Sequence, residues 1–159
     1  MTNMFKETLR PRGKIYIEVY DLENRIVDKI EHSNLILESG LAALCSVIAD
    51  NTAMNVNYIA CGNGTADPAP SDTRLVNELS RAEIIAKVSR NSNSVLFGSY
   101  FGFEKEAGII SEFGLVINGQ PAGDTGTFLA RSVIGNPVSK TNFNAFSITW
   151  VVTFAGDYE

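Results

Sequence analysis

The stretch from Tyr58 to Leu75, YIACGNGTADPAPSDTRL, holds residue types that could do chemistry. Its glycines, Gly62 and Gly64, could cradle a phosphate. Such a cradle needs a helix that begins directly after the glycines, so that the amides of its first turn face the anion. Here the segment DPAP follows at residues 67–70, and no lysine lies in the loop. Two prolines extend the chain instead of starting a helix, so we predict a turn and not a phosphate site.

Cys61, at the end of the apolar run, is the second chemical candidate. A cysteine nucleophile needs a base that generates its thiolate, and the single histidine of the chain, His32, lies in a distant, strand-like segment. The other cysteine, Cys45, forms no metal-binding or redox spacing with Cys61. The two thiols could pair if the fold brings them together, but we expect both to be reduced and buried. Without a cluster of histidines, cysteines or carboxylates, we predict no catalytic, cofactor-binding or metal-binding residue, and hence no enzyme.

Two charged residues stand inside apolar segments that otherwise read as strands. Glu112 lies in IISEFGLVI and Arg131 lies in TFLARSVI. A charge that is buried without a partner is costly, so we hypothesise that these two residues pair across neighbouring strands. The alternative, in which both point to solvent, stays open. Asp72 could cap a short helix or turn. A role for Asp72 as a general base has no support, because no second catalytic group accompanies it.

Composition and charge limit the class of protein. The 159 residues suffice for one domain with its own core, and the formal net charge is −5. Nucleic-acid-binding proteins usually carry the opposite sign, so we expect no nucleic-acid partner. No apolar run approaches the roughly 18 residues of a membrane span, and the first residues lack the apolar core of a secretory signal. We expect no membrane partner and a chain that stays in a reducing cytoplasm.

Alternation of apolar and polar residues predicts strands along most of the chain. In the segment of residues 14–21, KIYIEVYD, the aliphatic side chains face one way, and Tyr16 and Tyr20 face the other. Tyr100 likewise lies opposite an apolar face, and we predict that these three tyrosines are possible contact groups on outer strand faces. Trp150 shares the face of the large apolar residues of the last strand, which places it in the core.

One helix is expected, at about residues 39–50. Leu41, Leu44, Cys45 and Ile48 recur at helical spacing, and Ser39 could cap the first turn. We therefore predict a mainly β fold, an antiparallel β-sandwich of about eight strands with one short helix. Residues 1–13 are polar and basic and are expected to form an extended arm outside the core, and residues 14–159 a single β-sandwich domain.

The order of several short motifs resembles a group of small bacteriophage virion proteins that are encoded among tail and fibre genes. The pattern runs from a helix entry, NLILESG, through IACGNGTADPAPSDTRLVNELSR, EFGL and LAR to a final strand, ITWVVTF. It covers roughly residues 34–154. Cys61 departs mildly from the small or β-branched residue that is usual before the glycine. The resemblance implies a set of framework residues: Gly62, Gly64, Asp72, Glu78, Arg81, Glu112, Gly114, Arg131 and Trp150.

The resemblance also implies a function. It predicts a non-enzymatic structural protein of the virion, in the tail, baseplate or fibre-attachment region, assembled in the cytoplasm of a host bacterium. Its partners would be other virion proteins and further copies of itself, with a trimer as the expected homo-oligomer. The arm could become ordered on a neighbouring subunit.

Two alternatives stay open. A capsid decoration or cement protein would have much the same sequence. A carbohydrate-binding module that contacts the host surface is the alternative of another class, because Trp150 and the surface tyrosines could stack on sugars. The core position predicted for Trp150 opposes this last reading.

Overall fold

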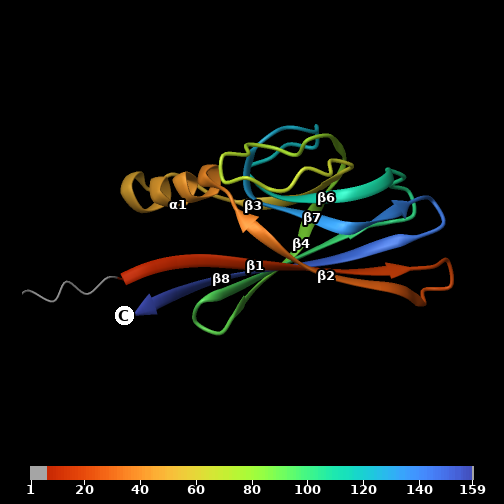
Figure 1. The fold of residues 1–159 in the computed structure, drawn as a ribbon, viewed down its shortest axis with the longest axis horizontal. Helices are drawn as coiled ribbons and strands as arrows, with labels where there is room; N and C mark the ends of the chain where they lie inside the picture. Colours follow the sequence, from red (N-terminus) through yellow and green to blue (C-terminus); the bar gives the residue numbers. More distant parts are fainter. Residues whose placement is uncertain (1–6, 159) are drawn as a thin grey trace, which may run out of the picture.

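A computed structural model describes the backbone of residues 7–158. This part of the chain forms eight antiparallel strands and one helix (Figure 1). The elements in chain order are β1 (Glu7–Tyr20), β2 (Ile26–Ile36), α1 (Glu38–Asp50), β3 (Val56–Gly62), β4 (Glu78–Arg90), β5 (Ser94–Phe101), β6 (Gly108–Ile117), β7 (Thr127–Lys140) and β8 (Ala145–Tyr158). The mainly β class, the strand number and the single short helix agree with the sequence prediction.

The strands close into a barrel, so the predicted sandwich is wrong. Their order is β1-β2-β7-β6-β3-β4-β5-β8, and the ring is completed where β8 pairs with both β1 and β5. Alternating side chains could not distinguish the two architectures, because a barrel and a sandwich both bury one face of every strand. The decisive feature is long-range pairing between the first and last strands, which local sequence does not encode.

Side chains fill the barrel interior. Trp150 of β8 is fully buried there with residues from every strand of the barrel, among them Ile15, Phe97 and Phe113. The indole Nε1 of Trp150 donates a hydrogen bond to Asn34 Oδ1 at 3.1 Å. A barrel of eight strands is just wide enough for such a filled core, and the core position predicted for Trp150 is confirmed.

The loop between β3 and β4, residues 63–77, lies over the outer face of the barrel (Figure 1). Its Leu75 packs with Tyr58, Val116 and Phe128, which alternate with inward-facing neighbours and so point outward. The barrel therefore has a second, smaller core on its outside. No helix begins at Asp72, as this loop contains none.

Helix α1 sits on β7 through its first turn. Its buried residue is Gly40, where a Cβ atom would lie only 2.7 Å from the Cα of Leu129. Ser39 is not the cap: the helix begins after Leu37, and the Ser39 hydroxyl donates to the carbonyl of Phe128 at 2.8 Å. Within the described residues, no helix is long and apolar enough to cross a membrane.

Part of the predicted arm belongs to a strand of the sheet. Residues 1–6 lie outside the described part of the chain, and residues 7–13 belong to β1, which pairs with β8 from Glu7 onward. Strand β2 joins β1 only at Gly13. Residues 7–12 of β1 with their partners 153–158 of β8 form what we call the terminal ribbon. It extends at the same end of the molecule as α1, and the turn between β1 and β2 lies at the opposite end (Figure 1).

Candidate functional site

A buried carboxylate fixes the loop of residues 63–77 on the barrel. Glu112 of β6 is fully buried, and its Oε1 accepts hydrogen bonds from the amides of Gly64 and Asn77 at 2.8 and 2.9 Å. Its Oε2 accepts a third from the amide of Val76 at 3.0 Å. The carboxylate thus binds both ends of the loop, which satisfies backbone donors that would otherwise be buried without partners.

Arg131 of β7 neutralises this carboxylate. Its Nε and a terminal nitrogen lie 3.0 and 2.9 Å from Glu112 Oε2, and β6 and β7 are neighbouring strands. The hypothesis that these residues pair across neighbouring strands is confirmed, and the solvent-exposed alternative is wrong. Arg131 also donates to the Asp72 carboxylate at 2.8 Å and to the carbonyl of Ala66 at 2.9 Å. One guanidinium therefore joins two strands and the middle of the loop.

The predicted framework glycines allow neighbouring groups to lie close to the backbone. They do not serve to adopt a special backbone conformation. Neither Gly62 nor Gly64 has a positive φ. A Cβ atom on Gly62 would collide with the backbone oxygen of Asn77, and one on Gly64 would lie 2.5 Å from Glu112 Oε1. At Gly114 a Cβ atom would lie 2.5 Å from the ring of Phe128. The glycines let the loop lie directly on the sheet.

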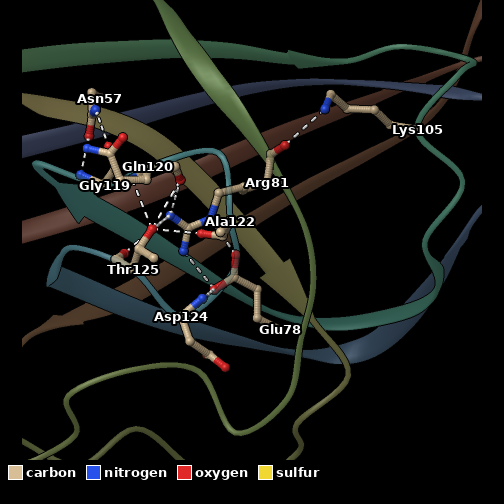
Figure 2. Close-up of polar contacts among 9 residues, drawn as sticks. All are labelled: Asn57, Glu78, Arg81, Lys105, Gly119, Gln120, Ala122, Asp124 and Thr125. Carbon is tan, nitrogen blue, oxygen red and sulfur yellow. Dashed lines mark hydrogen bonds and ion pairs between the residues drawn. The ribbon is translucent and has the colours of Figure 1, made fainter.

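A second ion pair fixes the loop between β6 and β7 (Figure 2). Arg81 and Glu78 of β4 pair through two contacts of 2.6 and 2.8 Å, and both side chains are buried. Arg81 also donates to the carbonyl of Gln120 and to the Thr125 hydroxyl, and Glu78 accepts the amide of Asp124. All five predicted charged framework residues therefore lie in two buried networks that attach loops to the barrel.

The structure does not bring together the residues that we considered as candidates for catalysis or metal binding. Burial raises the pKa of Cys61 to about 12, which opposes a thiolate. His32 of β2 contacts Ser33 and Ser132 instead, at 2.8 and 3.3 Å. Both cysteines are free, and Cys45 is exposed on α1, so the prediction that it is buried is wrong. Among the described residues, no group of three or more potential metal-ligating side chains occurs.

The predicted contact tyrosines lie on the outer face of the barrel. Tyr16 and Tyr100 are exposed, and Tyr20 is partly buried with its hydroxyl 2.6 Å from Glu18 Oε2. They belong to β1 and β5, on either side of β8. Two of the three rings are therefore accessible for contacts from the outside of the barrel.

A hollow on the described surface lies between the terminal ribbon, the end of β2 and the start of α1. It has a volume of about 890 Å³, and we call it the terminal groove. Leu9, Pro11 and Leu41 contribute apolar surface, and Arg10, Arg12 and Lys14 contribute three cationic side chains. The Nζ of Lys14 is already paired with Glu31 Oε1 at 2.5 Å. Sequence reasoning missed this groove, because it arises from the place where β2 leaves β1.

An apolar stripe on α1 continues from this groove. Leu41 lines the groove and is 39% exposed, Ile48 is 85% exposed, and the exposed Cys45 lies between them at helical spacing. The periodicity predicted that Leu41, Leu44, Cys45 and Ile48 share a face that packs on the barrel. Leu44 does pack against the core, and Gly40 makes the close approach to β7, but the other three residues are exposed.

Lys140 is a buried residue that sequence reasoning did not single out. Its Nζ donates to the carbonyls of Thr141 and Asn144, both at 2.8 Å, and lies 5.8 Å from the centre of the Phe146 ring. Burial is the main cause that lowers the pKa of this ammonium group below its usual value. Its sequence neighbourhood, NPVSKTNFN, predicts an exposed loop. In the structure, Lys140 is instead the last residue of β7, which the local sequence does not indicate.

Comparisons with known proteins assign no family to this fold. No protein-family model, no curated protein and no solved structure matches the chain. A functional reading therefore depends on the residues and surfaces described above: two loop-fixing ion networks, an outer face with tyrosines, and an apolar stripe beside the terminal groove.

Proposed function

We propose that this chain is a non-enzymatic structural protein of a bacteriophage particle that acts through assembly contacts. The observation that carries the proposal is the exposed apolar stripe on α1 beside the terminal ribbon. Large apolar side chains gathered on a surface favour a protein partner, and a two-stranded ribbon is only marginally stable without one.

The buried networks support an architectural role. Asp72, Glu112 and Arg131 hold one loop, and Glu78 and Arg81 hold another. These residues also occur in the motifs on which the resemblance to phage virion proteins depends. Loops fixed by buried ion pairs present the same surface to every neighbour, which a repeated assembly requires.

We place the protein in the tail, baseplate or fibre-attachment region, with other virion proteins and further copies of itself as partners. The place within the particle and the trimeric state follow from the resemblance alone. Capsid decoration is the competing place, since the same contact surfaces could clamp a capsid lattice.

Cryo-electron microscopy of particles from the phage that encodes the chain tests this proposal, with particles that lack the gene as the matched control. We expect density on the tail or its base that fits the eight-stranded barrel and disappears in the control. Density on the capsid lattice instead would establish the decoration role. Absence of the chain from purified particles, checked by mass spectrometry, would refute a virion role altogether.

One observation favours a second candidate, carbohydrate binding. Tyr58, Glu83 and the exposed Tyr100 line a hollow of about 320 Å³ together with Lys105. Aromatic rings beside polar groups suit a small polar ligand. Trp150 no longer supports this candidate, because it is fully buried. A glycan array with the wild-type chain and Tyr100→Ala tests it, and a signal that requires Tyr100 is the expected result for a sugar site.

A further inference from the structure

We propose that the first six residues of one copy of this chain add as a strand to an unpaired edge of β2 in the next copy. This inference rests on the assembly role proposed above and names the two surfaces that meet. Residues 1–6 precede β1 and lie outside the described part of the chain. The edge that they would occupy is formed by residues 29–33 of β2, and we call it the open edge.

The open edge exists because β2 and β7 separate. Their ladder holds only two pairs, Leu35 with Arg131 and Ile36 with Ala130, whereas β2 stays paired with β1 back to Ile26. Where the two strands part, residues 28–32 of β2 and 134–138 of β7 line a hollow of about 390 Å³. Within residues 7–158, no strand pairs with β2 on this side before Leu35.

The strand register identifies which backbone groups face this gap. The amide of Phe154 donates to the carbonyl of Asn93, so Phe154 and its partner Pro11 direct their backbone groups away from each other. Every second residue of β1 after Pro11 therefore faces β2, and the partners of these residues in β2 face β1. The residues between those partners direct their backbone groups into the gap: Lys29, Glu31 and Ser33.

Two contacts agree with this assignment. The amide of Lys29 donates to Asp28 Oδ1 at 2.8 Å, and the carbonyl of Ser33 accepts the Ser132 hydroxyl at 2.9 Å. Both groups use a side chain because no strand lies beside them. The backbone of Glu31, at the centre of the open edge, has no such side-chain partner among the described residues. A free amide and carbonyl on a strand edge are the groups that an added strand satisfies.

The sequence of residues 1–6, MTNMFK, fits this edge. The edge is five residues long, and strands of about five to six residues are the commonest in proteins. The segment contains no proline or glycine, the residues that weaken a strand. In an extended chain Met1 and Phe5 share one face, and the hollow beside the edge offers apolar side chains to that face, namely Ile30, Ile134 and Val138.

The segment cannot cover the open edge of its own copy. Glu31 pairs with Tyr16, which lies nine residues along β1 from Glu7, a distance of roughly 30 Å at about 3.3 Å per residue. Six fully extended residues span at most about 22 Å. The acceptor is therefore a second copy. The terminal ribbon is a poor acceptor, because Pro11 faces its open edge without a hydrogen to donate.

Such a contact joins two different surfaces. The terminal ribbon and the turn that precedes β2 lie at opposite ends of the molecule (Figure 1), so the contact can repeat from copy to copy. It generates a ring if the rotation closes and a filament if it does not.

The two surfaces can be disabled separately. Glu31→Pro removes the amide at the centre of the open edge, and it costs no hydrogen bond with β1 because this amide faces the gap. Glu31→Gln keeps the amide and is the matched control. Phe5→Asp replaces the largest apolar side chain of the segment with a charge, and Phe5→Leu is its control.

Analytical ultracentrifugation of the full chain over a range of concentrations gives the readout. We expect the wild type and both controls to form the same oligomers, and Glu31→Pro and Phe5→Asp each to associate at least roughly tenfold more weakly. A mixture of these two variants should form a complex of two chains and nothing larger, because one intact edge and one intact segment remain. Circular dichroism checks folding, and Phe5→Asp, which changes no residue of the barrel, decides if Glu31→Pro does not fold.

Hydrogen exchange gives a second measurement, which locates the contact. The amide of Glu31 should exchange more slowly in the oligomer than in the dilute monomer, whereas the amide of Ile30, which faces β1, should not change.

Three results would overturn the proposal: a wild type that stays monomeric at its highest soluble concentration, an oligomer in which the Glu31 amide is not protected, and a mixture that forms no two-chain complex. Equal weakening by Glu31→Gln and Glu31→Pro would also overturn it, because the side chain and not the backbone would then make the contact. Detection in particles is independent of these results, so the strand addition can fail while the virion role stands.

Discussion

Substitution of Glu112 by glutamine is the sharpest test of how the outer loop is held. The change, Glu112→Gln, preserves shape but replaces one carboxylate oxygen with an NH2 group. Both oxygens of Glu112 accept hydrogens: Oε1 from two backbone amides, and Oε2 from a third amide and from Arg131. In either orientation of the new side-chain amide, its NH2 group would therefore face donors, and Arg131 would lose its buried counter-charge.

The expected magnitude follows from burial. Removal of one partner from a buried ion pair costs about 3–5 kcal/mol. For a chain of this size, that loss lowers Tm by roughly 6–20 °C, because 1 kcal/mol corresponds to about 2–4 °C. The matched control is Glu31→Gln, which breaks the exposed pair with Lys14, where both side chains are 54% exposed. Exposed pairs contribute about 0.2–1 kcal/mol, so this control should change Tm little.

The assay combines thermal or urea unfolding with hydrogen exchange. Glu112→Gln should also speed exchange at the amides of Gly64, Val76 and Asn77, since these donors lose their acceptor. Asp72→Asn should have an intermediate effect, because the Asp72 side chain is partly exposed. A loss below about 1 kcal/mol for Glu112→Gln, the upper end for an exposed pair, or equal losses for the buried and exposed variants, would refute the reasoning.

Three further predictions concern the core, the loop contact and the buried lysine. Trp150→Ala should cost about 3–5 kcal/mol in urea unfolding, because it empties a fully buried site; a loss under about 1 kcal/mol would contradict the core position. Gly62→Ala should cost about 1–3 kcal/mol, because the new methyl group meets a backbone carbonyl, whereas Gly135→Ala, where nothing lies within 4 Å, should not; equal effects would remove the close-approach argument. The pKa of Lys140 should lie below 10.5 when its side-chain NMR signals are followed against pH. Because the unfolded chain then binds the proton more tightly, the contribution of Lys140 to stability should rise as pH rises from its folded-state pKa toward 10.5. Titration at or above 10.5 would show that the site is hydrated.

The sequence predicted what local patterns control. Strand faces were correct where apolar residues alternate cleanly, as at Trp150. The pairing of Glu112 with Arg131 was also predictable, because a charge buried in an apolar segment is costly unless an opposite charge pairs with it. The same reasoning failed for Lys140, because its segment shows no apolar pattern around the charge.

Contacts between distant segments were not predictable. Closure of the barrel depends on β8 pairing with β1, at the other end of the chain. In α1, the helical periodicity correctly predicted that Leu44 packs on the barrel, but not that Gly40 makes the close approach while Leu41 and Ile48 stay exposed. Likewise, nothing near Arg81 in the sequence indicates that Gln120 and Thr125 would be its partners.

Pairing of the first and last strands also has a consequence for the time course of folding. Until β8 has left the ribosome, β1 and β5 are both unpaired edges of an open sheet. Contacts of such long sequence separation form slowly, and open edges are prone to aggregation while they persist. The nascent chain therefore completes its fold only after synthesis, and no copy can present its finished outer surface before its last strand is in place.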